Sequence, residues 1–512
     1  MGVKIFPLRM PRAHCWNFSR PQSRPASAAG CRTILAGALI CLTLVGCAVG
    51  PDFKQPPPPV SARFAADATV SGGADQQRLT SSATLPEHWW TLFGSAQLDA
   101  LVEQALAGNP GLEVATATLR QTRAQLGIAQ AELLPSVDIA YAGERAKTAS
   151  ILSPTLNNND MLYSLHTAQV AVNYSLDLFG GARRNAESAR AQEEAAEFQY
   201  EAARLSIATN TVLAAIQAAS LQEQMDAAED NVASARQILR LFEKRQAIGD
   251  VGAADVAAQR AALAQAEQAL PPLRQALDAQ HATLSVLLGR EPGSALPPLP
   301  KLAELTLPRD LPLSLPSDLV RQRPDIRAAE ANLHAASANV GIAIAARLPD
   351  ISLQANIGGT ATRLADLFTG DAAFWSIGGG IVQPLFHGGA LRNQQRAAEA
   401  ALDVAKAQYR SIVLTAFQDV TNTLSALRND ADALQSAQQA ETAAEQAMKF
   451  TRRKLELGSA GTLDTLNARI TLQTARAAAI QFSAARYADT VALFQALGGG
   501  WWNRGSDRPS NE

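Results

Sequence analysis

The chain has 512 residues, 47% of them hydrophobic but only 5% aromatic, and it carries 45 basic against 47 acidic side chains. This length allows several domains. Alanine supplies much of the apolar content, and such small side chains suit closely packed long helices better than one large globular core.

The N-terminus predicts a secretory signal. A basic flank at Arg32 precedes an apolar run, Ile34 to Val45, that is too short to span a bilayer comfortably. The run ends in Leu44-Val45-Gly46-Cys47, which resembles a bacterial lipobox. That resemblance implies a signal peptide over 1–46, cleavage before Cys47, and a lipidated cysteine bearing N-palmitoyl and S-diacylglycerol groups. An ordinary signal peptide with an incidental cysteine is the alternative.

Cleavage would change both the thiol count and the charge of the chain. The other cysteines (Cys15, Cys31 and Cys41) precede Cys47, so no thiol would remain for a disulfide or a metal cluster. Six basic and no acidic residues would be lost, leaving 39 basic against 47 acidic side chains and a formal net charge of about −8. This balance excludes a nucleic-acid binder.

Residues 47–97 are expected to form a tether and an equatorial segment. Prolines at 56–59 predict a stiff, extended chain, and Trp89-Trp90 precedes the first helical pattern. For this tryptophan pair we weigh packing against an interfacial role and favour packing. Helix is predicted from Leu98 to about Leu134, interrupted at Gly108-Asn109-Pro110 and ended by Pro135.

The hydrophobic period changes to two in four short stretches, which predicts two β-hairpins at about 135–178 and 349–386. In each strand one face is apolar and the other is small and polar. This pattern fits a half-buried strand in a soluble sheet, or a strand between lipid and water.

A long stretch of predicted helix follows each hairpin, at about 182–248 and 390–457. Roughly 65 residues at about 1.5 Å each give a rod of about 100 Å. Glycines then reverse the chain, and the returning helices carry a coiled-coil seam of leucine and alanine. In the first of these, Pro271-Pro272 should introduce a kink.

The chain repeats itself. Asn109-Pro110 matches Arg323-Pro324, and near the reversals Gly249, Asp255 and Leu263 match residues 458, 464 and 472. We therefore expect two repeats, 98–290 and 317–498, joined by a proline-rich linker at 291–316 and followed by a tail at 499–512. Two copies of one substructure indicate an architecture built around an axis.

Counting strands points to an assembly. Two separate hairpins leave the backbone groups of their edge strands unpaired and are only marginally stable in water, and four strands cannot close a barrel. Eight strands from two chains would close around packed side chains, whereas twelve from three chains would leave an open lumen. Because the polar strand faces carry Ser, Gln, Asn, Asp, Gly and Ala, we favour three chains.

Several motifs resemble those of the outer membrane efflux lipoproteins of the TolC/OprM type, NodT subgroup. The motifs occur in the family's order, and the match covers essentially all of the mature chain. They are residues 49–53 (VGPDF), 89–93 (WWTLF), 176–180 (LDLFG), 315–326 (LPSDLVRQRPDI), 384–389 (PLFHGG) and 496–501 (ALGGGW).

The resemblance implies a mainly α fold with a small β part: a coiled-coil α-barrel of two long-helix repeats and a transmembrane β-barrel, with four strands per chain and twelve in a homotrimer. Such a protein is a lipid-anchored outer-membrane exit duct with a long periplasmic part. It works with a periplasmic adaptor and an inner-membrane pump, commonly of the RND type, in efflux systems that include those of multidrug resistance. The cargo stays open among drugs, aromatic acids, metals and siderophores.

The resemblance also places a periplasmic aperture at the reversals. Asp464 matches one of two stacked aspartates that ring the closed pore in relatives, and Asn467 stands at the second position. Asp255 matches an aspartate that, in relatives, helps to keep the aperture closed by binding a tyrosine and an arginine. The positions of these two partners are occupied by Leu455 and Ala460 in this chain. Three nearby bases, residues 452–454, are candidates to replace them. The alternative for both aspartates is a carboxylate favoured by the helix dipole.

Other functions find little support. The five histidines after Cys47 lack metal-ligand spacing and are expected on the surface or in loops. No phosphate-binding loop or nucleophile elbow is present in the sequence, so we expect neither an enzyme nor a cofactor beyond the lipid. A periplasmic coiled-coil scaffold or adaptor lipoprotein is the alternative to a channel.

Overall fold

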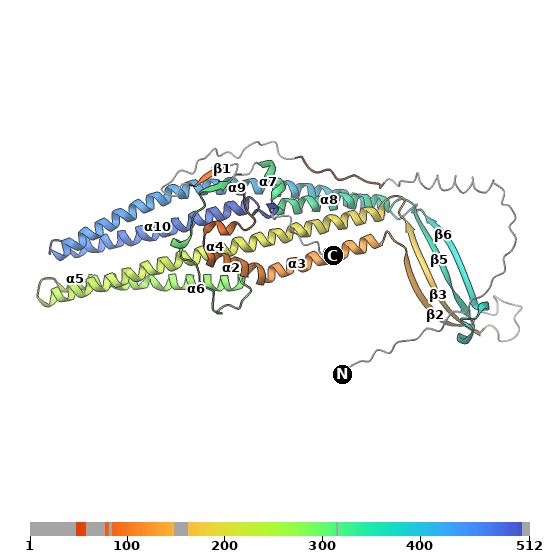
Figure 1. Cartoon of the computed structure of the whole chain (residues 1–512), viewed down its shortest axis with the longest axis horizontal. Helices are drawn as coiled ribbons and strands as arrows, with labels where there is room; N and C mark the ends of the chain where they lie inside the picture. The colour runs from red at the N-terminus through yellow and green to blue at the C-terminus, as the bar shows by residue number, and fades with distance from the viewer. Residues whose placement is uncertain (1–47, 58–76, 81–83, 148–161, 314–315, 504–512) are drawn as a thin grey trace, which may run out of the picture. The chain divides into compact units, whose positions relative to one another are not determined.

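The computed structural model describes residues 48–57, 77–80, 84–147, 162–313 and 316–503, and Cys47 lies outside them. Long helices and one four-stranded sheet make up most of this part of the chain (Figure 1). None of its helices combines the length and the apolar character that a membrane crossing requires.

The predicted repeat is visible as two runs of equivalent elements. The first run is α3 (Pro110–Ala131), β2 (Ser136–Lys147), β3 (Leu162–Leu176) and α4 (Gly181–Ala247). The second is α8 (Pro324–Ala345), β5 (Asp350–Ala361), β6 (Ala373–Val382) and α9 (Ala390–Glu456). The two long helices, α4 and α9, have 67 residues each. A proline at the start of α3 and of α8 explains why both begin there, since proline suits the first helical turn.

The returning helices differ between the repeats. In the second repeat, α10 (Thr462–Ala496) is continuous over 35 residues. In the first, the helix is divided into α5 (Ala253–Gln268) and α6 (Leu270–Leu287). The prolines at 271 and 272 therefore lie in the first turn of a new helix, and the single residue between the two helices, Ala269, keeps a right-handed helical backbone (φ −72°, ψ −21°). A proline cannot continue the hydrogen bonding of a preceding turn but is tolerated in the first turn of a new helix.

The two hairpins join into one antiparallel sheet in the order β2-β3-β5-β6. Its register aligns Ile139, Val170, Ile357 and Trp375 in one row across all four strands. On the opposite face, the row of residues 136, 173, 354 and 378 consists of Ser, Asn, Gln and Gly. The sheet thus has one apolar face and one small, polar face that both continue from strand to strand.

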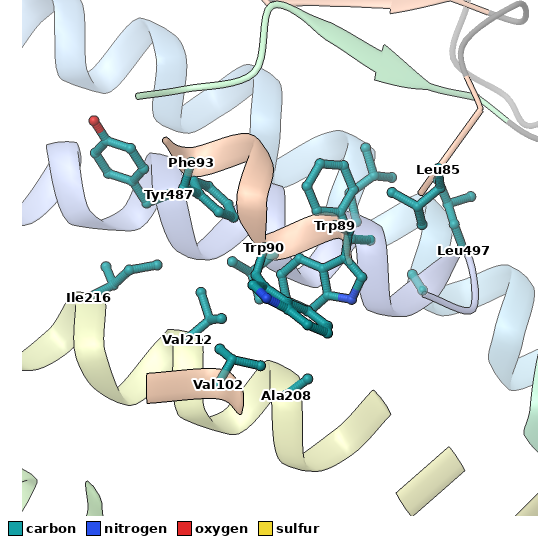
Figure 2. Close-up of a cluster of buried hydrophobic side chains, with 14 of the residues drawn as sticks. Leu85, Trp89, Trp90, Phe93, Val102, Ala208, Val212, Ile216, Tyr487 and Leu497 are labelled. Carbon is teal, nitrogen blue, oxygen red and sulfur yellow. The ribbon is translucent and has the colours of Figure 1, made fainter. Parts of the chain in front are cut away.

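The main hydrophobic core lies where helix η1 (Trp89–Phe93) and helix α2 (Ala96–Gly108) pack among the long helices. Figure 2 shows Trp89, Trp90 and Phe93 between Val212 of α4 and Tyr487 of α10. Trp89 is 1% exposed, so the interpretation of the Trp89-Trp90 pair as a packing element is confirmed.

The proline-rich linker takes part in the same core. Its strand β4 (Asp310–Pro312) pairs in parallel with β1 (Arg78–Thr80), and Leu302, Leu305 and Leu311 are buried. This pairing was not predicted, because each strand has three residues and no alternating pattern. The start of the second repeat is tied down as well: Arg323 binds Asp325 at 2.6 Å and Asp419 of α9 at 3.0 Å.

Candidate functional site

The two helix reversals are held together by an apolar cluster. Glycines with positive φ, Gly249 and Gly458, form the turns. Beside them, Phe242 of α4 and Val256 of α5 pack with Leu455 of α9. Residues 238 and 460 complete the buried part of this cluster. The two positions where the resemblance implies a tyrosine and an arginine, Leu455 and Ala460, are therefore apolar here, and they stabilise the reversals by burial.

Asp255 connects the two reversals. Its Oδ2 accepts a hydrogen bond from the backbone N–H of Gly252 at 3.2 Å, which caps its own helix. Its Oδ1 accepts a hydrogen bond from the hydroxyl of Thr462 at 2.8 Å, at the start of α10. The carboxylate is thus both a helix-terminal group and a link between repeats. Thr462 was not predicted as a partner, because its repeat counterpart is an alanine and the internal repeat therefore does not mark this position.

The bases at 452–454 do not replace the missing partners of Asp255. No ion pair found among the described residues joins any of them to this carboxylate. Arg453 instead pairs with Glu456 of its own helix at 3.0 Å.

Asp464 and Asn467 lie on one exposed face at the start of α10. They are three residues apart, so their side chains are neighbours on the helix surface. Asp464 Oδ2 accepts a hydrogen bond from the N–H of Gly461 at 3.1 Å and keeps its other oxygen for solvent or an ion. The helix-terminal role considered for both aspartates is therefore present in the structure, and it leaves Asp464 available for a second role.

A second cluster clamps the residues that follow Cys47. The N–H of Val49 donates to the carbonyl of Phe179 at 3.0 Å. The buried guanidinium of Arg184, in the first turn of α4, binds Asp52 at 2.6 Å, Glu187 at 2.7 Å and the carbonyl of Val49 at 3.2 Å. Burial alone would lower the pKa of Arg184, but the hydrogen bonds that it donates to both carboxylates, and their negative charge, outweigh burial and raise the pKa.

Close backbone packing completes this clamp. A Cβ on Gly50 would lie 2.5 Å from the Cα of Gly341 in α8, so neither glycine tolerates a side chain. The ring of Phe53 stacks on His334 at 4.4 Å, and His334 also binds Glu187 at 2.9 Å. The prediction that the histidines lie on the surface or in loops is wrong for His334, which is half-buried in a helix between α4 and the N-terminal segment.

Residues 49–53 stood out as a motif in the sequence, but Arg184 did not, because its distant neighbours come from two separate segments, residues 49–52 and α8. The prediction of lipid on Cys47 falls outside the described residues. Within those residues, no group of three or more His, Cys, Asp or Glu side chains is placed to hold a metal ion.

Comparison with known proteins shows which family the chain resembles. The profile of the family described as "Outer membrane efflux protein" matches residues 101–290 and 315–499. The pyoverdine export outer membrane protein OpmQ of Pseudomonas aeruginosa is 32% identical over 425 residues, which cover 82% of this chain and 89% of OpmQ.

Solved structures show the same relationship. The outer-membrane channel OprN superimposes with a TM-score of 0.81 at 30% identity, over 89% of this chain and 100% of that one. The CmeC outer membrane channel of Campylobacter jejuni gives a TM-score of 0.80 at 25% identity, over 89% and 95% of the two chains. These matches confirm the predicted efflux channel, which is not an enzyme, and favour it over a periplasmic scaffold. The chain therefore belongs to the outer membrane efflux protein family.

Proposed function

We propose that three copies of this chain form the outer-membrane exit duct of a tripartite efflux system, with one β-barrel of twelve strands. The observation that carries this proposal is the four-stranded sheet. Its apolar face is exposed in a single copy: Ile139 is 86% exposed and Trp375 is 73% exposed. A continuous apolar face of this kind is costly in water and suits contact with lipid.

The sheet edges support the same conclusion. Within the described residues, β2 and β6 each pair on one side only. An open edge in a lipid environment would leave backbone groups without hydrogen bonds, so edges of neighbouring copies should pair. Two copies would give eight strands and a filled interior, whereas three give a lumen that the Ser, Asn and Gln face can line with water.

The helical hairpins would then form the periplasmic tunnel. At its tip, three copies of Asp464 would make one acidic ring, with Asn467 beside it in place of a second ring. The bond between Asp255 and Thr462 would hold the two reversals of each copy together while the aperture is closed. A periplasmic adaptor would dock on the tunnel, and an inner-membrane pump of the RND type would energise transport and choose the cargo.

The anchor is the remaining part of the proposal. Lipid on Cys47, as N-palmitoyl and S-diacylglycerol groups, would attach two residues before Val49. Val49 is bonded to Phe179, directly between the end of β3 and the start of α4. The acyl chains would therefore leave the protein beside the strand-to-helix junction, where a barrel would meet the periplasmic membrane surface.

Disulfide crosslinking between sheet edges tests the assembly. Ala140→Cys in β2 is combined in turn with Ser376→Cys, Gly378→Cys and Gly380→Cys in β6, which lie on the same face. At least one pair should give a ladder of dimers and trimers on a non-reducing gel that stops at the trimer. Cys47 is the one native thiol expected after cleavage, and its acylation keeps the background low.

The matched control places the cysteines at Ala171 and Asn356, which are direct partners in β3 and β5. That pair should form a disulfide within one copy and leave the protein monomeric on a denaturing gel. If the control forms and no edge pair links two copies, or if the ladder stops at two or four copies, the twelve-stranded barrel is wrong.

A further inference from the structure

A cavity of about 660 Å³ lies between the two helical hairpins of one copy. Residues from four places line it, and it is partly open to solvent: α4, the junction of α5 and α6, α9 and α10. Apolar side chains from all four elements line it, including Ala228, Leu273, Met448 and Leu472. Pro272 also lines it, so the cavity lies where the first repeat is interrupted and the second is not.

One buried guanidinium in this cavity has no charged partner in the part of the chain that the structure describes. Arg469 of α10 is 6% exposed, and its Nη1 is buried without a hydrogen-bond partner among the described residues. Its Nη2 makes one long contact, 3.4 Å, to the carbonyl of Ala262 in α5. Burial lowers the pKa of Arg469, and no nearby carboxylate opposes this. Burying a charge without a counter-charge costs free energy, so a bound anion would stabilise Arg469.

The internal repeat shows how this imbalance arises. Arg260 is the counterpart of Arg469, because each lies eleven residues after its reversal glycine. Arg260 is exposed and binds Glu243 of α4 at 3.1 Å. Glu243 lies six residues before Gly249, and the residue six before Gly458 is Arg452. In the second repeat, a base thus occupies the place of the carboxylate.

The other charges around the cavity do not restore the balance. Its lining includes four bases, Lys449, Arg452, Arg469 and Arg476, but two acids, Asp230 and Glu445. Arg476 already contacts Glu445 at 3.5 Å, and it also contacts Glu441. The lining therefore keeps an excess of positive charge around the one base that is buried.

We propose that this cavity binds a small organic anion, with its carboxylate on Arg469 and its apolar body against the alanine, leucine and methionine walls. The volume suits a ligand of drug-like size, and a few polar groups in a mostly apolar pocket are typical of such sites. An inorganic anion would satisfy the charge but leave the apolar walls without contacts. The site belongs to a single copy and does not depend on barrel closure or on conduction.

Equilibrium dialysis of the purified full-length protein, with equal detergent on both sides, tests the site. The probes are 1-naphthoate and its neutral analogue 1-naphthamide. The wild type should bind naphthoate more tightly than naphthamide. Arg469→Gln should weaken naphthoate binding by about 30-fold or more, since it removes the buried partner of a charged group, and should change naphthamide binding little.

Two variants sharpen the test. Arg260→Gln changes the exposed repeat counterpart and should leave naphthoate binding as in the wild type. Arg452→Glu restores the carboxylate that the first repeat has, so it should neutralise Arg469 internally, abolish naphthoate binding and raise the melting temperature. Equal naphthoate binding by the wild type, Arg469→Gln and Arg452→Glu would overturn the proposal.

A measurement without any variant covers the case in which Arg469→Gln fails to fold. Crystals of the wild type soaked with 5-bromo-1-naphthoate should show the bromine anomalous signal inside the cavity, between α4 and α10. A signal confined to other places, or none at a concentration that saturates binding in solution, would equally refute the site.

Discussion

Asp489 of α10 gives the sharpest test of how the helical hairpins respond to pH. It lies against Asp430 of α9, and its Oδ2 is buried without a hydrogen-bond partner among the described residues. Burial, together with the charge and hydrogen bond of Asp430, raises the pKa of Asp489 from 3.8 to about 7, although Arg486 acts in the opposite direction.

The sign of the effect follows from proton binding. Between about pH 4 and pH 7, Asp489 is protonated in the folded hairpin but ionised in the unfolded chain. The folded state binds more protons in this window, so its stability falls as the pH rises and is constant above about pH 7. A full conversion of the pKa shift gives about 4 kcal/mol. Because Asp489 is only half-buried, solvent screening reduces this to about 1–2 kcal/mol.

Hydrogen exchange measured by mass spectrometry can detect this difference locally. After correction for intrinsic rates, peptides of α9 and α10 around Asp430 and Asp489 should lose about 5- to 30-fold in protection between about pH 5 and pH 8.5. Asp489→Asn should remove this pH dependence and protect both helices better at high pH. The control, Asp432→Asn, changes an exposed carboxylate nearby on α9 and should behave as the wild type.

Two results would refute the reasoning. One is an equal pH dependence in the wild type and in Asp489→Asn. The other is a wild type whose protection does not change with pH.

Three further predictions concern the proposed duct. Cys47→Ser should lose palmitate labelling, and a variant protein that still carries palmitate would contradict the anchor. Asp464→Ala should raise the cation conductance of the reconstituted channel and weaken its block by divalent ions, since a ring of carboxylates binds cations; unchanged conductance and block would remove the aperture assignment. Arg184→Ala should loosen the N-terminal clamp by about 2 kcal/mol, because Asp52 and the carbonyl of Val49 lose the guanidinium that ties them to α4, and should speed trypsin cleavage after Lys54 by about 30-fold. The exposed repeat counterpart, Arg392→Ala, should leave cleavage unchanged, and equal rates in both variants would show that Arg184 does not hold the segment.

The sequence was sufficient for the order and type of the main elements. The long helices, the four strands and the glycine reversals are local features, and each follows from hydrophobic period and from the backbone preferences of glycine and proline. The internal repeat added the equivalence of the two halves. An interruption of the returning helix near Pro271 was expected as well.

Tertiary structure decided which distant groups meet. Arg184 contacts Val49, Asp52 and a helix from the second repeat, and no local sequence pattern predicts these long-range contacts. The same holds for the bond between Asp255 and Thr462, because a threonine at a helix start usually serves its own helix. The contrast between Arg260 and Arg469 is the clearest case. The sequence gives both repeats the same arginine, but only packing exposes one and buries the other, because burial depends on neighbours that the repeat does not specify.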